Sequence, residues 1–297
     1  MSNNHPLFIL FAQHGWADTN QPIQSLVQSL APSEGIIAPN LGWLKTWWSI
    51  EPLIKKVEDI AIATLQKYPN TPWRIIGHSM GGLIWVELLH RHPEWRSRVH
   101  SLVLVASPIG GSDLGYLLDV SLIGLGIAKD LSTNRREMVE EIAAEIPTLA
   151  IAGDIDGGSD GTVIIGATQC DRIQFITIPV SHPKLKNHPR LISLIQTFWS
   201  NPIITFPPKS TFKTELIREL RFTGGVFDAH PRDFPRSQIV AHLPEGITLR
   251  TWKNPLNQLQ HIFLGDRDNQ CIYSAFVSWE KYAEFQQKLT QILDGLN

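Results

Sequence analysis

The chain has 297 residues, of which 43% are apolar and 18% are charged, and its formal net charge is −2. This size allows one large domain or two modest domains with a sizeable core. The near-neutral charge gives no reason to expect nucleic acid or another polyanion as a partner, and short basic runs such as Lys209 to Arg221 are expected to be solvated faces.

The N-terminal residues, the longest apolar tract and the cysteines bear on the cellular compartment of the protein. Residues 1–6 are polar and lack the basic and then apolar pattern of a signal peptide. The longest apolar tract, residues 114–128, contains Asp119 and is too short to span a bilayer. Cys170 and Cys271 match no metal or redox spacing and fit a reducing compartment. The alternative is a single disulfide between them. We therefore expect a cytoplasmic protein with no transmembrane segment and no cofactor.

The first two thirds of the chain alternates short apolar runs with amphipathic segments. Residues 51–68, for example, place apolar side chains at helical spacing, and Pro69 ends that pattern. The predicted strands cover residues 7–12, 36–38, 73–76, 101–106, 148–152 and 173–178, and the predicted helices cover residues 51–68, 80–91 and 188–199. This alternation predicts an α/β fold with a doubly wound, mostly parallel six-stranded sheet and right-handed crossovers.

The pattern changes after residues 202–209 (PIITFPPK), which have the composition of a linker. Beyond them we predict helices over residues 211–221 and 279–293, and four short strands over residues 238–242, 248–252, 260–264 and 271–277. Consecutive strands flanked by helices predict a small α+β domain over residues 210–297, after a first domain over residues 1–201. We expect the first domain to need nothing beyond its last helix for its chemistry.

One loop of the C-terminal domain contains three polar side chains, Asp228, His230 and Asp233. Such residues often hydrogen-bond to their own backbone in turns. We therefore interpret the three side chains as turn residues rather than as a site. The rest of this domain resembles no family that we identify, so its role stays open.

The turn after the strand at residues 73–76 reads Gly77-His78-Ser79-Met80-Gly81-Gly82, which matches the pattern G-x-S-x-G. Because glycine and serine are common, this pattern alone should occur in about one unrelated chain of this length in ten. An apolar strand before it and an apolar helix after it raise its value. Small residues two positions before and after Ser79 relieve crowding on a tight turn, and the helix N-terminus favours developing negative charge. The alternative is a glycine-rich turn in which Ser79 only caps the helix.

These residues resemble the nucleophile elbow of the α/β-hydrolase superfamily. The His14-Gly15-Trp16 turn after the first strand and the segment over residues 101–112 resemble the same superfamily, its lipases and esterases in particular. The resemblance covers residues 7 to about 200 and implies the minimal form with six parallel strands, as in small bacterial lipases. It also implies that Ser79 is the nucleophile.

The resemblance implies an acid and then a histidine after the serine in chain order. His182 follows an apolar strand and is the predicted base, whereas His188 is expected to begin the next helix. Three aspartates compete for the acid, of which Asp154 has no further support. Asp160 is favoured because Gly-Thr-Val follows it, as after the acid in lipases, while Asp156 has the spacing of many other members. The acid would orient the imidazole of His182.

The oxyanion of an acyl-transfer intermediate needs preorganised N–H donors. The resemblance implies that the backbone N–H groups of Met80 and Trp16 supply them. His14 is expected to brace the loop rather than act as a base, because the base of this superfamily comes last in order.

A metal site in the aspartate-rich loop is the other interpretation of residues 154–165. The spacing of an EF-hand fails there, because Gly158 and Ile165 stand where ligands are needed. We therefore expect no metal.

An insertion is expected over residues 108–147, where this superfamily usually has a cap. Its apolar tract, residues 114–128, and its helical segment, residues 134–146, either wall an acyl pocket or pack as ordinary crossover helices. Aromatic residues expected near the mouth of the site, and interpreted as packing residues, are Trp43, Trp47 and Trp48.

The sequence therefore predicts a serine hydrolase that cleaves a carboxylic ester through an acyl-enzyme on Ser79. A small-molecule ester or acyl compound would be its substrate. The alternatives are an acyltransferase, thioesterase or amidase with the same triad, and a non-enzymatic scaffold that binds a partner through its C-terminal domain.

Overall fold

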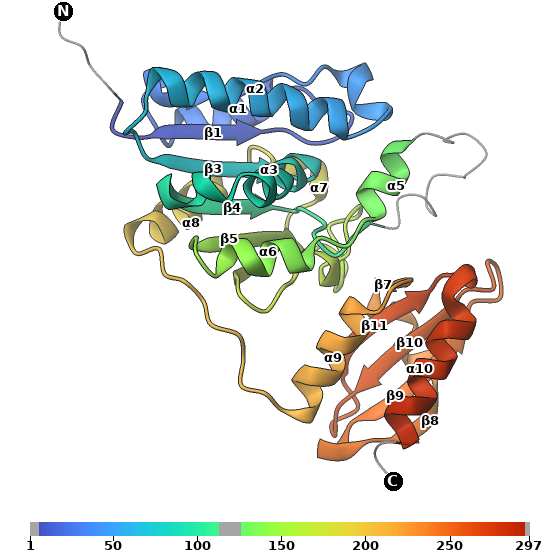
Figure 1. Cartoon of the computed structure of the whole chain (residues 1–297). Helices are drawn as coiled ribbons and strands as arrows, with labels where there is room; N and C mark the ends of the chain where they lie inside the picture. The colour runs from blue at the N-terminus through green and yellow to red at the C-terminus, as the bar shows by residue number, and fades with distance from the viewer. Residues whose placement is uncertain (1–5, 113–125, 295–297) are drawn as a thin grey trace, which may run out of the picture.

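The computed structural model describes residues 6–112 and 126–294, and its first sheet has six parallel strands in the order β2-β1-β3-β4-β5-β6 (Figure 1). The strands are β1 (Ile9–Gln13), β2 (Ile36–Ile37), β3 (Trp73–His78), β4 (Val99–Val105), β5 (Thr148–Gly153) and β6 (Gln174–Ile178). All neighbouring pairs are parallel. The predicted six-stranded parallel sheet is therefore confirmed.

Helices cover both faces of this sheet, because its strands are apolar on both sides. On β1, Ile9 and Phe11 face one core cluster, and Leu10 and Ala12 face the other. The first cluster is covered by α2 (Glu51–Lys67), α3 (Met80–Arg91) and α6 (Arg136–Ala143). The second is covered by α1 (Gln21–Gln28), which the sequence analysis missed, and α8 (Pro189–Ser200). The longest described helix, α2, has 17 residues, and none of the described helices has the length and hydropathy to cross a membrane.

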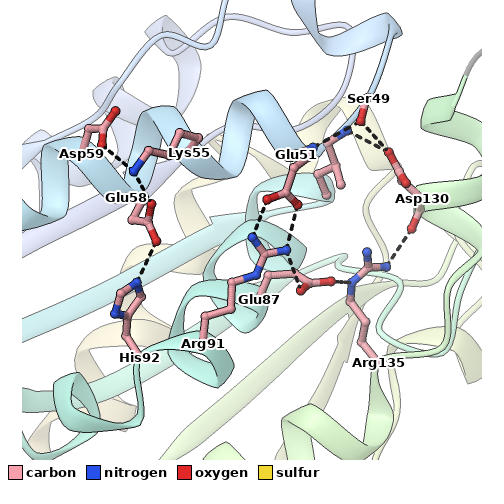
Figure 2. A network of polar contacts seen from close by, with 11 residues as sticks. Ser49, Glu51, Lys55, Glu58, Asp59, Glu87, Arg91, His92, Asp130 and Arg135 are labelled. Carbon is pink, nitrogen blue, oxygen red and sulfur yellow. Dashed lines mark hydrogen bonds and ion pairs between the residues drawn. The ribbon is translucent and has the colours of Figure 1, made fainter.

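The predicted insertion over residues 108–147 is described in part. Residues 113–125, which hold most of its apolar tract, lie outside the described residues, and α5 (Gly126–Ser132) and α6 follow them. Figure 2 shows how polar contacts join α5 to α2 and α3. Arg91 pairs with Glu51 at 2.6 Å, Arg135 pairs with Glu87 at 2.8 Å, and Arg135 also donates to the Asp130 carbonyl. The described part of the insertion is therefore fixed on the helices that cover the sheet.

The C-terminal region, residues 212–294, contains a second sheet, which has five antiparallel strands among the described residues, in the order β7-β11-β10-β9-β8. Its strands are β7 (Val226–Asp228), β8 (Gln238–His242), β9 (Thr248–Lys253), β10 (Gln260–Gly265) and β11 (Cys271–Val277). The helices α9 (Phe212–Phe222) and α10 (Tyr282–Asp294) pack on one face. The sequence analysis predicted four strands and placed β7 in a loop, which is wrong.

The C-terminal region contacts the parallel-sheet region through side chains of α9, which lies on the side of β5 (Figure 1). Both terminal nitrogens of Arg218 donate to the Glu140 carboxylate at 2.7 Å, and Arg221 donates to the Gln169 side chain at 2.7 Å. The prediction of a solvated face is therefore wrong for Arg218 and Arg221, whereas Lys209 and Lys213 are exposed. Residues 202–211, which precede α9, form no helix or strand.

Candidate active site

The turn between β3 and α3 holds Ser79 in a strained conformation. Its φ is 54° and its ψ is −127°, in a region that residues with a side chain rarely occupy. Such strain costs about 1–3 kcal/mol and persists only where the surroundings impose it. Here the Ser79 N–H donates to the Val105 carbonyl at 2.8 Å, and the Ser79 carbonyl accepts from the Gly82 N–H at 3.0 Å. These two hydrogen bonds fix the turn at both ends.

The glycines of the turn are required by close backbone approach. A Cβ at Gly77 would lie 2.3 Å from the Cα of Gly82. A Cβ at Gly81 would lie 2.2 Å from the carbonyl oxygen of Gln13, at the end of β1. The absence of these atoms lets the first turn of α3 rest against the elbow and against the loop after β1.

The loop between β5 and β6, residues 154–173, presents Asp160 to His182. Asp160 Oδ2 lies 2.7 Å from His182 Nδ1, and the carboxylate is 1% exposed. Its other oxygen accepts from the backbone N–H groups of Thr162 and Val163 at 2.9 and 2.7 Å. The His182 N–H donates to the Asp160 carbonyl at 2.9 Å, so backbone and side chain both tie the two residues together.

The Asp160 contact determines the tautomer of His182. A carboxylate oxygen accepts, so Nδ1 of the neutral ring carries the proton and Nε2 has a free lone pair. The ring is stacked at an angle against that of His78, with centroids 4.9 Å apart. Since His78 directly precedes Ser79, the structure brings Ser79, Asp160 and His182 to the same edge of the parallel sheet.

The neighbouring His78 is a buried imidazole that the sequence analysis did not single out. Burial, together with the nearby His182, lowers the pKa of His78 well below its ordinary value. The ring is therefore neutral at neutral pH and adds no positive charge beside His182. Only its position before the serine in the elbow motif could have pointed to it.

The loop after β1 passes directly over the elbow. A Cβ at Gly15 would lie 2.8 Å from Ser79 Cβ and 3.3 Å from Ser79 Oγ, so Trp16 follows at the point of closest approach. Met80 is the first residue of α3, where backbone N–H groups have no partner within the helix. Trp16 and Met80 thus lie on the two segments that flank Ser79.

His14 braces the loop after β1, as expected. Its Nε2 accepts from the Leu41 N–H at 2.9 Å, and its Nδ1 donates to the Gly15 carbonyl at 3.0 Å. Burial lowers the pKa of His14.

The Trp16 ring packs on Trp47 with centroids 4.4 Å apart, and Trp43 packs on Trp47 in turn at 5.5 Å.

The competing candidates have other partners. Asp154 accepts from the Gly157 N–H at 2.7 Å, and Asp156 contacts Ser159 and His230 rather than His182. His188 caps α8 by accepting from the Arg190 N–H at 3.3 Å. Among these aspartates, Asp160 is the one that the structure pairs with His182.

The thiols do not compete with Ser79 as nucleophiles. Cys170 and Cys271 are both free. Burial raises the pKa of Cys170 to about 12 and that of Cys271 to about 11, so both are protonated at neutral pH. Within residues 6–112 and 126–294, no three His, Cys, Asp or Glu side chains are grouped as a metal site would require.

A buried ion pair that the sequence analysis missed lies at the far end of the β5–β6 loop. Arg136 Nη2 lies 2.6 Å from Asp228 Oδ2, and the two side chains are 2% and 3% exposed. Arg136 also donates to the carbonyls of Gly166 and Gln169, both at 2.9 Å. Asp228 is in β7 and pairs across 92 positions of sequence, so its interpretation as a turn residue is wrong.

Comparison with known proteins finds a family model that matches part of the chain and distant structural neighbours. Residues 37–156 match the family described as alpha/beta hydrolase fold, a range that includes Ser79 but neither Asp160 nor His182. The lipase BlEst2 of Bacillus licheniformis in its propeptide form aligns with a TM-score of 0.52 and 14% identity over 71% of this chain. Its mature form aligns with a TM-score of 0.49 and 14% identity over 66% of this chain and 94% of its own. No curated protein sequence matches the chain.

The phospholipase PlaB of Legionella pneumophila aligns with a TM-score of 0.44 and 16% identity over 55% of this chain. These alignments span 44% of the PlaB chain and 54% of the propeptide form of BlEst2. At such identities the likeness extends to the fold alone. The fold assignment rests on the family match and on the propeptide form of BlEst2, and both agree with the resemblance stated from sequence.

Proposed function

We propose that this chain, whose parallel-sheet region has the α/β-hydrolase fold, is a serine hydrolase that cleaves a small-molecule carboxylic ester. The fold hosts many chemistries, so the proposal rests on the site rather than on the family. The observation that carries it is the 2.7 Å contact between Asp160 and His182 at the sheet edge where the strained Ser79 turn lies.

In the first half of the reaction, Ser79 Oγ attacks the acyl carbonyl carbon while His182 Nε2 takes the hydroxyl proton. The tautomer of His182 supports this role, because Nδ1 carries the proton donated to Asp160 and Nε2 is free to accept another. The carbonyl oxygen becomes negative, and the N–H groups of Trp16 and Met80 would stabilise it. The C–O bond to the alcohol then breaks, and His182 returns the proton to the leaving alkoxide.

In the second half, water attacks the acyl-enzyme by the same route. His182 takes a proton from the water, the acyl–Ser79 bond breaks, and the proton returns to Ser79 Oγ. Asp160 stays ionised, holds the imidazole in orientation and stabilises the imidazolium that forms in each half. Its burial and its two backbone donors support a fixed position for that carboxylate.

The surroundings of the site support an ester with an apolar portion. The aromatic series Trp16, Trp47 and Trp43 leads away from the loop beside Ser79, and Trp43 is 47% exposed. A structural neighbour with a TM-score of 0.52 is a lipase. Aromatic side chains supply large apolar contact area for such a group.

The test is Ser79→Ala, assayed with p-nitrophenyl esters of two to twelve carbons and with a fluorophosphonate probe. Loss of the nucleophile in other triad hydrolases costs on the order of 10⁶-fold in kcat, so both turnover and labelling should vanish. Ser193→Ala, an exposed serine on α8, is the matched control and should leave both unchanged. Retention of a tenth of wild-type activity by Ser79→Ala would remove Ser79 from the mechanism.

The same preparation separates the alternative functions. A thioester, an anilide and an added alcohol acceptor would report thioesterase, amidase and acyltransferase activity through the same Ser79. If the wild-type chain neither reacts with the probe nor turns over any of these compounds, the non-enzymatic scaffold is the better description.

A further inference from the structure

A chain of hydrogen bonds runs from the C-terminal region to the residues that flank Asp160. His230 Nε2 lies 3.0 Å from Asp156 Oδ1. The Asp156 carboxylate also accepts from the backbone N–H and the hydroxyl of Ser159, at 2.8 and 2.9 Å. Ser159 Oγ in turn accepts from the Gly161 N–H at 3.1 Å. Since Ser159 and Gly161 are the neighbours of Asp160 in sequence, the loop conformation around the acid is coupled to His230.

His230 is held in place by its own region. Its Nδ1 accepts from the Arg232 N–H at 3.0 Å. The proton of the neutral ring is therefore on Nε2, where it is donated to Asp156. The preceding Ala229 donates its N–H to the Ser274 carbonyl on β11 at 2.9 Å. The antiparallel sheet thus fixes the position and the donor direction of this imidazole.

The charge state of Asp156 suits the acceptor role. Burial alone would raise its pKa, but the hydrogen bonds from His230 and Ser159 outweigh burial and lower the pKa below its ordinary value. Asp156 is therefore a carboxylate at neutral pH and can accept all three bonds. Its side chain is 38% exposed, so without His230 the fixed donor would be replaced by mobile water.

The β5–β6 loop packs closely against the C-terminal region at Gly158. A Cβ at Gly158 would lie 2.6 Å from Pro231 Cδ and 2.9 Å from His230 Nε2. At the far end of the loop, Arg136 binds the Gly166 carbonyl and Asp228 together. The β5–β6 loop is thus held by the C-terminal region near Asp160 and again near its end.

We propose that His230 is a positioning residue, whose hydrogen bond to Asp156 holds the β5–β6 loop so that the Asp160 carboxylate stays aligned with His182. This role rests on the proposed function, in which Asp160 orients the catalytic base. A displacement of about 1 Å in a catalytic constellation can cost on the order of 100-fold in rate. The C-terminal region therefore contributes to turnover without touching the substrate.

The first experiment compares three variants of the full chain with p-nitrophenyl butyrate. His230→Ala should lower kcat by about 10- to 100-fold with little change in KM, because an interaction that serves the chemical step is lost. His230→Gln places an amide N–H near the position of Nε2 and should restore most of the rate. His242→Ala, an exposed histidine on β8, is the matched control and should equal the wild type.

A double-mutant cycle with Asp156→Ala tests the route of the effect. If His230 acts through Asp156, His230→Ala should have its full effect in the wild type and almost none in Asp156→Ala. Additive effects of the two changes would overturn the proposed route. Equal kcat values for His230→Ala, His230→Gln and the wild type would overturn the positioning role itself.

A spectroscopic measurement keeps this test independent of turnover. The low-field proton resonance of the His182 Nδ1–H reports its hydrogen bond to Asp160 directly. His230→Ala should shift or broaden this resonance while the melting temperature changes by no more than about 3 °C, and His242→Ala should leave it unchanged. If the wild type turns over no ester, the proposed function fails, yet an unchanged resonance in His230→Ala would separately overturn the positioning role.

Discussion

The two sheets of the molecule arrange their loops differently. In the parallel sheet all strands point the same way, so the loops after β3, β5 and β6 meet at one edge. His78, the residue before Ser79, contacts His182 there although 104 positions separate the two histidines in the sequence. In the antiparallel sheet successive strands reverse direction, and their loops alternate between two edges. The catalytic candidates therefore lie together on the loops at one edge of the parallel sheet.

The C-terminal region carries no recognised motif, yet its contacts reach the loop that holds the proposed acid. The antiparallel sheet presents one end, with Asp228 and His230, to the loop that holds Asp160. We propose that the first sheet carries the catalytic side chains, and we infer that the second sheet holds the loop of the acid in position. Variants that affect one role and spare the other can sharpen or break this division.

After the loss of Ser79 itself, the largest expected effect is that of Asp160→Asn. An asparagine at this position favours the wrong tautomer of His182, and the corresponding change in another triad hydrolase lowers kcat by about 10⁴-fold. The fold should survive, because the amide oxygen can still accept from the Thr162 and Val163 N–H groups. Steady-state kinetics with p-nitrophenyl butyrate and circular dichroism provide the measurement.

Asp156→Asn is the paired control for that variant. Its amide oxygen can still accept from His230, so kcat should stay within about 10-fold of the wild type. If Asp156→Asn is the inactive variant and Asp160→Asn the mild one, then Asp156 is the acid and the alignment of this loop with lipases is wrong.

The catalytic candidates could be predicted because their signals are local in sequence. The elbow needs a strand, small residues around Ser79 and a helix, and all lie within residues 73–91. The histidine and the acid follow strands whose apolar runs are short and clear. The helix α1 also has a local signal in the sequence, because Pro22 is followed by Ile23, Leu26 and Val27 at helical spacing, and all three are buried.

The contacts between the two regions could not be predicted, because they depend on how two separately patterned segments dock. Arg136 sits in an ordinary helical pattern, and nothing near it in the sequence points to Asp228. β7 has three residues after two glycines, too few for a periodic pattern to emerge. The basic side chains of α9 look solvated in sequence because their acidic partners, such as Glu140, lie far away along the chain.

The next effect in size concerns the buried pair between the two regions. Asp228→Asn leaves the Arg136 guanidinium without a counter-charge in a site that is 2% exposed. Removal of one partner of a buried pair costs about 3–5 kcal/mol, measured as the free energy of unfolding in urea. Asp233→Asn disrupts a pair with Arg236, whose side chain is 69% exposed, and should cost less than about 1 kcal/mol. Similar losses in both variants would mean that the docked geometry is not maintained in solution.

A smaller effect is expected from a single methyl group between the two regions. Gly158→Ala places a Cβ against Pro231 and His230, and overpacking of this kind costs about 1–3 kcal/mol. It should also lower kcat, because the loop must move away from His230. Gly224→Ala adds the same methyl group where no atom lies within 4 Å and should change neither stability nor kcat. If Gly158→Ala also changes neither quantity, the loop has freedom that the packing does not suggest.

The smallest expected effect lies away from both the site and the contact between the regions, at the end of α3. His92 stacks on Trp95 with ring centroids 3.9 Å apart, and its Nδ1 contacts Glu94. Its Nε2 contacts Glu58, as Figure 2 shows. Burial lowers the pKa of His92, but the hydrogen bonds with the two glutamates outweigh burial and raise it above 6.5. Because the folded pKa exceeds the unfolded one, the protonated ring stabilises the fold.

That stabilisation is fully present below the unfolded pKa of about 6.5 and is lost as the pH rises through the folded pKa. His92→Gln should therefore destabilise the chain more at about pH 5.5 than at about pH 8.5, with a difference below about 1 kcal/mol because the pair is partly exposed. Urea unfolding at the two pH values measures it. When the His92→Gln comparison is repeated in a chain that carries Glu58→Gln, the difference should shrink, because one of the two negative charges that favour the protonated ring is gone. A larger loss at the higher pH would mean that the neutral ring, through its stacking on Trp95, is the form that stabilises the fold.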